Sequence, residues 1–369
     1  MALLKHVQLE GFRSIKQIAV NFRALNILIG ANGAGKSNFV SFFKMMNEMM
    51  GGRLQQFIST TGRAQANLYF GPKVTPQLTA RLEFETDNGI DTYMMRLFHA
   101  AGDSLVFAEE TLSFHQHGWS GSPKEVSLGA GHQETSVVEK AKEGEPVAKA
   151  LRYMLNSCRV FHFHDTSPTA RVRQYHYVAN HRFLMPDAAN LAPILFRWKR
   201  ENEPVYDRII RTIQQIAPFF EDFELAPEGK NDPSLILNWR HRKSDLVFGP
   251  QQLSDGTLRA ICLIALLLHP EEELPKLIVV DEPELGLHPY ALNVIASLIQ
   301  AASHHTQVLI STQSSTFLDN FEPEDIIVVE REGEESKFIQ PNVENLTTWL
   351  DEYSLGEVWE KNVIGGGPH

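Results

Sequence analysis

Residues 30–37, Gly-Ala-Asn-Gly-Ala-Gly-Lys-Ser, match the pattern GxxxxGK[ST] and constrain the fold more than any other stretch of the chain. The apolar run Leu25–Ile29 precedes this loop, and apolar residues recur at helical spacing from Lys36 to Met50. The sequence therefore predicts a strand, a phosphate-binding loop and a helix in that order. Such a loop turns backbone N–H groups toward phosphate oxygens, and the helix start adds a partial positive charge.

The loop also supplies side chains that suit a nucleoside triphosphate. Lys36 is predicted to reach the β- and γ-phosphate oxygens and to act in catalysis, while the Ser37 hydroxyl binds Mg²⁺. A glycine-rich helix start that binds nothing is the alternative, which the strand and helix on either side disfavour. The predicted nucleotide-binding residues of this segment are Gly30, Asn32, Gly33, Ala34, Gly35, Lys36, Ser37 and Asn38.

A second apolar run, Leu277–Val280, ends in the two carboxylates Asp281 and Glu282. A buried parallel strand is apolar throughout, and ligands collect at the carboxyl ends of such strands. Asp281 is therefore predicted to hold Mg²⁺, directly or through water. Glu282 is predicted to orient or deprotonate the attacking water as the catalytic acid–base group. A solvated strand end is the alternative, and the phosphate loop upstream makes it the weaker one.

The segment Leu253–Thr257, Leu-Ser-Asp-Gly-Thr, precedes an apolar helix that is predicted from Leu258 to Leu268. Ser254, with Asp255 and Gly256, would form a second anion site at this helix start. One nucleotide rarely needs two such helix ends. Two copies of the chain arranged head to tail would use both, each phosphate loop facing the other copy's Ser254. The alternative is that Ser254 is an ordinary helix N-cap.

Together the segments GANGAGKS, LSDGT, LIVVDEPELGLHP and STQSS resemble the ABC-type ATPases of the RecF, SMC and OLD class. More closely, the chain resembles short bacterial RecF-like ATPases of the AAA abortive-infection and defence type. The resemblance covers roughly residues 1–50 and 250–369, with a looser match at 162–167. It implies ATP and Mg²⁺ as cofactors, with a homodimer or higher assembly.

The resemblance assigns roles to the motifs. It implies that residues 30–37 are Walker A, that Ser254 to Gly256 are the signature, and that Asp281 and Glu282 are Walker B and the catalytic acid. It further implies that residues 284–289 form the D-loop between subunits. A β-hairpin is predicted from Val7 to Phe22, and the resemblance brings its Arg13 near the nucleotide; a plain turn arginine is the alternative.

The chain departs from the wider pattern at Gln313, where most relatives carry histidine. Glutamine can donate an N–H to a γ-phosphate oxygen, so Gln313 is retained as a catalytic candidate, but it cannot carry a proton. Slow hydrolysis is expected for this reason. The Q-loop glutamine is not assigned, because Gln65, Gln77 and Gln174 are all candidates.

The predicted fold is an α/β, ABC-type P-loop ATPase head with a mixed or parallel central sheet, an antiparallel β lobe and a helical lobe. Between Ser37 and Ser254 there is no heptad run, so a coiled-coil arm is not expected. Four segments are predicted: an N-terminal ATPase lobe with a β-meander (1–115), an inserted loop and helical lobe (116–250), a C-terminal ATPase lobe (251–342) and a C-terminal helix and tail (343–369).

Four further features of the sequence bear on local structure or binding. His162 and His164 lie two residues apart, which suits a metal but also a structural role beside the nucleotide. The polar stretch Gly118–Pro146 is predicted to be a loop, and Leu191–Phe220 a helical region broken by its prolines. Ten basic residues in the middle of the chain could contact phosphate backbones or simply face solvent: Arg159, Arg171, Arg173, Arg182, Arg197, Lys199, Arg200, Arg240, Arg242 and Lys243.

Composition limits the remaining classes. The formal charge of −11 argues against a protein that coats nucleic acid, although a local basic groove is compatible with it. Two cysteines without a CxxC pair argue against a disulfide framework or zinc module. The apolar run Ile261–Leu268 has eight residues, against about 20 needed to span a bilayer. A cytoplasmic location without membrane contact is expected.

The leading functional hypothesis is therefore an ATPase that closes as a dimer on two nucleotides. Closure would control a DNA or RNA transaction or a separate effector protein, such as a nuclease or toxin, in anti-phage defence or DNA repair. The chain beyond Ser314 has 55 residues, too few for an appended nuclease domain. A slow-turnover, nucleotide-gated scaffold is the main alternative, motivated by Gln313. A transporter motor subunit fits poorly, because LSDGT differs from the usual LSGGQ.

Overall fold

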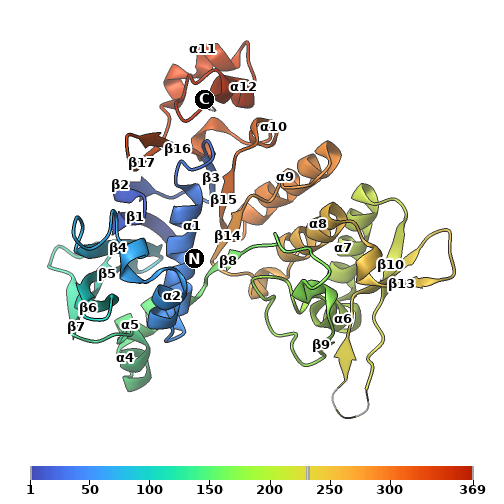
Figure 1. Cartoon of the computed structure of the whole chain (residues 1–369), viewed down its shortest axis with the longest axis horizontal. Helices are drawn as coiled ribbons and strands as arrows, with labels where there is room; N and C mark the ends of the chain where they lie inside the picture. Colours follow the sequence, from blue (N-terminus) through green and yellow to red (C-terminus); the bar gives the residue numbers. More distant parts are fainter. Residues whose placement is uncertain (1, 230, 232, 368–369) are drawn as a thin grey trace. The chain divides into compact units, whose positions relative to one another are not determined.

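The computed structural model describes residues 2–229, 231 and 233–367. The chain forms two compact units, drawn with their elements labelled in Figure 1. The first comprises Met1–Val160, Pro275–Val279 and Gln307–His369, and the second Phe161–Leu274 and Val280–Thr306. The division into four segments made from the sequence stays a prediction.

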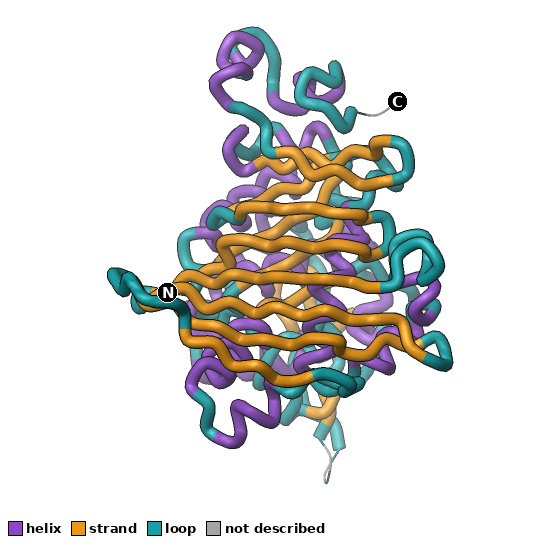
Figure 2. The backbone as a smooth tube through the Cα atoms, turned by 90° about the vertical axis from the view of Figure 1, so that its left-hand side faces the viewer, coloured by secondary structure: helices purple, strands orange, loops and turns teal. Residues whose placement is uncertain are grey.

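A six-stranded antiparallel sheet forms one part of the first unit, and its strands run side by side in Figure 2. Its order is β2-β1-β4-β5-β6-β7. The predicted hairpin is confirmed: β1 pairs with β2 in antiparallel register, with Arg13 and Ser14 at the turn. The strands are β1 (Leu3–Phe12), β2 (Ile15–Asn21), β4 (Gln77–Thr86), β5 (Gly89–Ala100), β6 (Ser104–Gln116) and β7 (Lys124–Gly129).

A second six-stranded sheet carries the phosphate loop and has the order β17-β16-β3-β15-β14-β8. The strand β3 runs parallel to both β15 and β16, whereas β16 and β17 are antiparallel, so the sheet is mixed as expected. β3 is buried along its whole length, and its one polar side chain, Asn26, donates to the Val308 carbonyl oxygen at 3.2 Å. The strands are β3 (Leu25–Ile29), β8 (Cys158–Phe161), β14 (Leu277–Asp281), β15 (Gln307–Thr312), β16 (Ile326–Glu332) and β17 (Glu335–Ile339).

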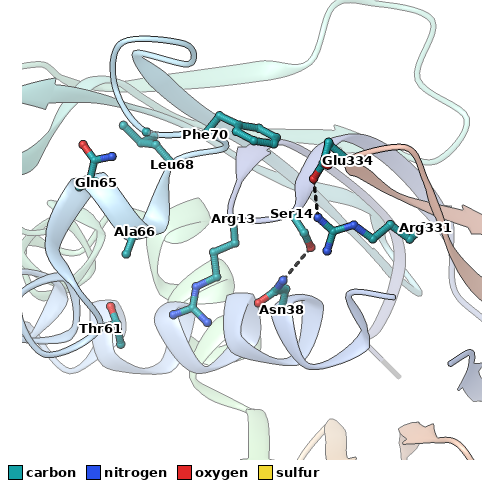
Figure 3. A pocket seen from close by; sticks show the side chains of 11 residues that line it. Arg13, Ser14, Asn38, Thr61, Gln65, Ala66, Leu68, Phe70, Arg331 and Glu334 are labelled. Carbon is teal, nitrogen blue, oxygen red and sulfur yellow. Dashed lines mark hydrogen bonds and ion pairs between the residues drawn. The ribbon is translucent and has the colours of Figure 1, made fainter. Parts of the chain in front are cut away.

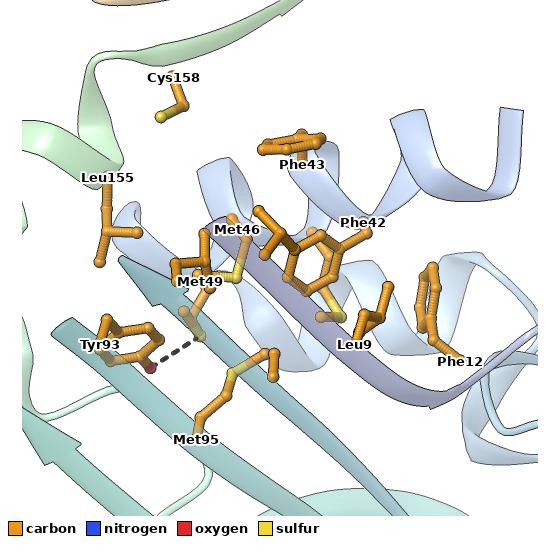
Figure 4. Packing of buried hydrophobic residues seen from close by; sticks show 14 of the residues in the cluster. Leu9, Phe12, Phe42, Phe43, Met46, Met49, Tyr93, Met95, Leu155 and Cys158 are labelled. Carbon is orange, nitrogen blue, oxygen red and sulfur yellow. Dashed lines mark hydrogen bonds between the residues drawn. The ribbon is translucent and has the colours of Figure 1, made fainter. Parts of the chain in front are cut away.

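The helix α1 (Lys36–Met50) has the predicted bounds and packs its apolar side into the core of the first unit. Its phenylalanines interlock at ring-centroid distances of 5.3 Å for Phe39–Phe43 and 6.1 Å for Phe42–Phe12. Figure 4 shows this face of α1 against the sheet, where the Tyr93 hydroxyl lies 3.7 Å from the Met49 sulfur. Such burial of large aromatic groups is a main source of folding free energy.

The prediction that Gly118–Pro146 is a loop is wrong. This stretch contains β7 and the helix α4 (Val137–Glu143), and Pro146 begins the helix α5 (Pro146–Asn156). β7 is an edge strand with no buried residue, so its sequence lacks the alternation of buried apolar and exposed polar residues that would predict a strand. The turn before α4 is fixed by Glu110, a fully buried carboxylate that accepts hydrogen bonds from the Thr135 hydroxyl and, at 3.0 Å, from the Ser136 amide.

The first unit also contains short helices. The predicted C-terminal helical stretch is present as three separate turns of helix, because the chain turns away after each one. Val358 and Trp359 in the last of them are buried. The remaining helices of this unit are α2 (Leu54–Thr60), α3 (Arg63–Asn67), α10 (Ser315–Leu318), η4 (Pro323–Asp325), η5 (Val343–Asn345), α11 (Thr347–Leu350) and α12 (Leu355–Glu360).

The second unit is mainly helical. Of the prolines predicted to break Leu191–Phe220, Pro193 lies within the first turn of its helix, where it is tolerated, and the break falls at Asn202. Ser254 precedes the buried helix α8 as expected. The helices are η1 (Arg171–Arg173), α6 (Leu191–Glu201), α7 (Glu203–Ile216), η2 (Pro250–Gln252), α8 (Asp255–Leu267), η3 (Glu271–Glu273) and α9 (Pro289–Ser303).

Short strands complete the second unit. β10, β12 and β13 form a three-stranded antiparallel sheet, and β9 pairs with β11. Their bounds are β9 (His176–Tyr177), β10 (Phe220–Glu224), β11 (Ser234–Leu235), β12 (Asn238–His241) and β13 (Val247–Phe248). No helix in the described part of the chain exceeds 15 residues, so the structure agrees with a head that has no coiled-coil arm.

Candidate nucleotide site

The phosphate loop connects β3 to α1 in the first unit and holds its lysine inside the turn. The Lys36 ammonium donates to the carbonyl oxygens of Gly30 at 2.6 Å and Ala31 at 3.1 Å, and the side chain is 4% exposed. Asn32 and Ser37 are exposed. The positive charge is therefore held within the curve of the loop, while the hydroxyl that would meet a metal faces solvent.

Gly35 requires glycine for two reasons. Its φ of 118° lies in the region that side chains disfavour, and a Cβ there would lie 2.0 Å from the Ser336 hydroxyl oxygen. Ser336 also hydrogen-bonds Ser14 in the first hairpin at 2.8 Å, and Ser14 accepts from Asn38 at 2.6 Å. The loop, the hairpin turn and β17 are thus tied together at the start of α1.

Gln313 lies at the same sheet edge as the phosphate loop. β15 is parallel to β3 with Thr312 opposite Ile29, so Gln313 and Gly30 follow two neighbouring strands at the same level. Ser314 then caps α10 by accepting from the Phe317 amide at 3.1 Å. The parallel register therefore brings together two predicted site residues that are 283 positions apart.

An open pocket of about 760 Å³ lies beside the start of α1 (Figure 3). It is large enough for a nucleoside, since small-ligand sites span about 300–1,000 Å³. Sequence reasoning missed most of its lining, because the residues come from separate elements. They are Arg13, Ser14, Asn38, Thr61, Gln65, Ala66, Leu68, Phe70, Gly71, Arg331 and Glu334.

Arg13 is one of the lining residues, and its conformation is fixed. Its φ is +53°, and its guanidinium donates to the Asn67 amide oxygen at 3.2 and 3.3 Å. Asn67 is itself held, because its amide donates to the Thr61 hydroxyl at 2.8 Å. Burial lowers the pKa of the Arg13 guanidinium. Arg13 is thus a cation held in place at the pocket, and its role toward a nucleotide stays a prediction.

The remaining predicted residues belong to the second unit. Ser254 is the N-cap of α8, since its hydroxyl accepts from the Thr257 amide at 3.2 Å. This is the alternative interpretation of Ser254, and it leaves the residue exposed. Asp255 accepts from the buried Arg173 guanidinium at 2.9 Å. Arg173 also donates to the Leu253 carbonyl at 3.3 Å, so it holds the backbone just before α8 in place.

Gly256 packs directly on the segment predicted to be the D-loop. A Cβ on Gly256 would lie 2.3 Å from the Gly286 carbonyl oxygen. Arg259, one turn along α8, donates to the Leu285 carbonyl oxygen in the same segment. The signature and residues 284–289 are therefore one packed structure within the second unit.

Asp281 and Glu282, at the end of β14 and just after it, differ in backbone conformation. Asp281 is the last residue of the strand, and Glu282 has a φ of +45°, which is rare for a residue other than glycine. The His164 Nε2 donates to the Asp281 carbonyl oxygen at 2.8 Å. Among the described residues, no group of three His, Cys, Asp or Glu side chains could hold a metal ion, so His162 and His164 form no such cluster.

Other candidates have local roles. Gln65 lines the pocket, whereas Gln174 donates to the Pro168 carbonyl at 3.2 Å in the second unit. Half of the ten basic residues noted in the middle of the chain are ion-paired internally, which favours a structural role for them. The pairs are Arg171–Asp187, Arg173–Asp255, Arg197–Glu273, Lys199–Asp222 and Arg240–Glu224. In the described residues, no helix is long and apolar enough to cross a bilayer.

Two family models match the chain. Residues 159–319 match the family described as "AAA domain, putative AbiEii toxin, Type IV TA system", and residues 1–58 match "Protein of unknown function (DUF2813)". A search of the curated proteins finds no match.

Several solved structures share the fold. An SMC head bound to the C-terminal winged-helix domain of ScpA is 16% identical with a TM-score of 0.61, covering 94% of this chain and 99% of that one. An SMC head with an extended coiled coil, bound to the C-terminal domain of ScpA, from Pyrococcus furiosus, is 16% identical with a TM-score of 0.58, covering 95% and 99%. An SMC head with a coiled coil and joint from Pyrococcus yayanosii is 12% identical with a TM-score of 0.54. The match covers 95% of this chain and 99% of that one.

The fold is therefore that of an SMC head, with the predicted antiparallel lobe and mixed sheet. Residues 159–319 match the AAA domain family, and this match and the SMC-head fold agree with the resemblance to the RecF- and SMC-type ATPases that the motifs carry. The predicted fold is confirmed.

Proposed function

We propose that the chain binds and hydrolyses Mg-ATP in a homodimer. The observation that carries this proposal is the Lys36 ammonium, held inside the loop by the Gly30 and Ala31 carbonyl oxygens beside a nucleoside-sized pocket. A buried cation and a ring of loop amides suit a triphosphate. In this arrangement the base and ribose occupy the pocket near Asn38, with Arg13 at its wall.

The two residues predicted from the sequence to hold magnesium have suitable side chains. The exposed Ser37 hydroxyl and the Asp281 carboxylate are oxygen donors of the kind that Mg²⁺ prefers. The ion would neutralise phosphate charge when bound. Glu282 accepts the proton of the attacking water, while Gln313 donates to the γ-phosphate.

Dimer formation is supported by what the second unit exposes. Ser254 is exposed at the start of α8, and Leu285 in the predicted D-loop and Tyr290 just after it are 42% and 54% exposed. Large apolar side chains at the surface next to an anion-binding helix start suit an interface that closes over a nucleotide. In the dimer, each Ser254 faces the nucleotide of the partner copy.

The output of the closed dimer is proposed to be control of a nucleic-acid transaction or of a separate effector, such as a nuclease or toxin, in the cytoplasm. One SMC head of this fold is bound to a winged-helix domain of ScpA, so a head of this fold can take a protein partner. The AAA domain family named for an AbiEii toxin favours anti-phage defence over repair.

A second candidate is a nucleotide-gated scaffold with very slow turnover. Gln313 favours it, because an amide cannot exchange a proton with phosphate or water as imidazole can. The two candidates share the same site and differ in rate alone.

The test uses the full chain and its Lys36→Ala variant. ATP binding is measured by calorimetry and phosphate release by a coupled assay, each with and without Mg²⁺. We expect Mg-dependent phosphate release by the wild-type chain and loss of binding in Lys36→Ala. Tight binding with less than about one turnover per hour would favour the scaffold, and no binding would overturn both candidates.

A further inference from the structure

Two residues outside the nucleotide motifs contact the backbone that carries the catalytic acid. His164 comes from the segment that follows β8, and its Nε2 donates to the Asp281 carbonyl oxygen at 2.8 Å. That carbonyl belongs to the peptide group that joins Asp281 to Glu282, the residue with φ of +45°. The hydrogen bond is therefore made at the peptide that leads into the strained position.

Strain of this kind is informative. A non-glycine residue at positive φ costs about 1–3 kcal/mol and persists only where its surroundings fix it. At Glu282 the carboxylate is aimed by this backbone conformation, because φ sets the direction of the Cβ. A hydrogen bond to the preceding carbonyl restricts the rotation that would relieve the strain.

Arg259 also contacts this part of the chain. It is the one basic residue in α8, whose other residues from Leu258 onward are apolar, and it is 6% exposed. Its Nε donates to the Phe163 carbonyl at 3.0 Å, its Nη2 to the His164 carbonyl at 3.3 Å, and its Nη1 to the Leu285 carbonyl. Burial lowers the pKa of this guanidinium.

The contacts of Arg259 join three parts of the second unit. One guanidinium links the signature helix to the backbone of His164 and to the loop after Glu282. His164 in turn links that backbone to Asp281. Charge-assisted bonds to carbonyl oxygens are stronger than neutral ones, so this path is stiff. These contacts form one connected path from the helix that Ser254 caps to the peptide group before Glu282.

We propose that His164 and Arg259 are positioning residues that hold Glu282 for attack on the γ-phosphate and couple it to the signature helix. This inference rests on the proposed ATPase function and names the residues that set its rate. Neither side chain needs to touch the nucleotide. They govern the chemical step, and ATP affinity is set by the phosphate loop in the first unit.

The experiment compares His164→Ala and His164→Gln in the full chain. Glutamine keeps an N–H donor, so its variant is the conservative rescue. His162→Ala is the matched control, since it removes a second imidazole from the same segment. For each chain we measure kcat, the ATP dissociation constant and the melting temperature.

We expect His164→Ala to lower kcat by about ten- to a hundredfold, since misplacement of a reacting group by about 1 Å has effects of this size. ATP affinity stays within about twofold of wild type, and His164→Gln recovers part of the rate. His164 is exposed, so the melting temperature stays unchanged. Arg259→Lys and Arg259→Met test the coupling: we expect the cooperativity of turnover with ATP concentration to fall, more in Arg259→Met.

Failure of this inference can be told apart from failure of the proposed function. Normal wild-type turnover with an unchanged kcat in His164→Ala overturns the positioning role alone. A loss of kcat that follows a loss of ATP affinity or of folding in His164→Ala also overturns it. A wild-type chain that binds ATP without hydrolysing it overturns the hydrolytic function and this inference together.

Discussion

The α-carbon of Gly256 faces the Gly286 carbonyl oxygen so closely that an added Cβ would lie 2.3 Å from it. The helix α8 therefore rests on the loop that follows Glu282, with no room for a side chain. Because both residues belong to the second unit, this contact is present in each separate copy of the chain.

We expect Gly256→Ala to abolish dimer formation and turnover, since the new methyl group forces the two segments apart. Overpacking of this kind costs about 1–3 kcal/mol. ATP binding by the monomer should stay within about twofold, because the phosphate loop lies in the other unit. Light scattering and calorimetry check this. Gly249→Ala is the control, because its Cβ would meet only Asn238 at an ordinary 3.8 Å. A Gly256→Ala chain that still dimerises contradicts the prediction.

Glu282→Gln should bind ATP, stop turnover and accumulate as a dimer. Removal of the base costs about 10²–10⁴ in rate, while the amide leaves the site the same size. Phosphate release and light scattering with ATP measure the two effects. Glu272→Gln, an exposed carboxylate on η3, is the matched change that should have no effect. Wild-type hydrolysis by Glu282→Gln would make the assignment of the acid wrong.

Ala66→Trp should separate base binding from phosphate binding. Ala66 lines the pocket beside α1, and an indole there fills the space assigned to the base. We expect ATP affinity to fall by at least about tenfold, or about 1.4 kcal/mol, whereas inorganic tripolyphosphate binds as before. Titration calorimetry with both ligands tests this, and Ala101→Trp in an exposed turn is the control. Equal loss of both ligands would mean that the phosphate loop itself was distorted.

Gln313→His should raise turnover. An imidazole at the end of β15, level with the start of the phosphate loop, can carry a proton or a positive charge that the amide cannot. We expect kcat to rise by at least about tenfold, within the range of general acid–base effects. Gln313→Leu, which removes the donor, should lower it. Unchanged rates in both variants would exclude this position from the reaction.

Asp91 gives the chain a pH-dependent stability. It lies on β5 opposite Phe84 and Phe114 and is 4% exposed, and burial raises its pKa from the usual 3.8 to about 6. A group with a raised pKa contributes stability that is complete below the unfolded pKa and is lost as the pH rises through the folded one.

Asp91→Asn should therefore be more stable than wild type at pH 8, by up to about 3 kcal/mol, since each pKa unit is worth about 1.4 kcal/mol. The two chains should have similar stability at pH 4, where Asp91 is protonated in the folded state. Urea unfolding at both values measures this. Asp245→Asn, in an exposed loop, should show no such difference. A gain that is independent of pH would rule out charge burial as its cause.

Local pattern was enough to locate the phosphate loop, β3, α1, α8 and β14. Each of these elements is apolar over most of its length or is preceded by a residue type that local geometry requires, such as Gly35 or Ser254. The β-meander strands were predicted for the same reason, since their sequences alternate. These are properties of a short stretch of chain, so neighbours far away in sequence do not alter them.

β7 and α4 could not be predicted, because an exposed edge strand has no apolar face and Glu110 fixes the turn from another strand. The sequence likewise could not predict which residues line the pocket, or that Gln313 and Gly30 follow neighbouring strands at the same edge of the sheet. It also could not predict the contacts of His164 and Arg259. A lone arginine in the apolar helix α8 was the one available signal. The sequence by itself determined which residues form the phosphate loop and which chemical groups they offer to a ligand. The tertiary structure alone decided which distant residues surround it, because strand register and helix packing bring together groups that no spacing along the chain relates.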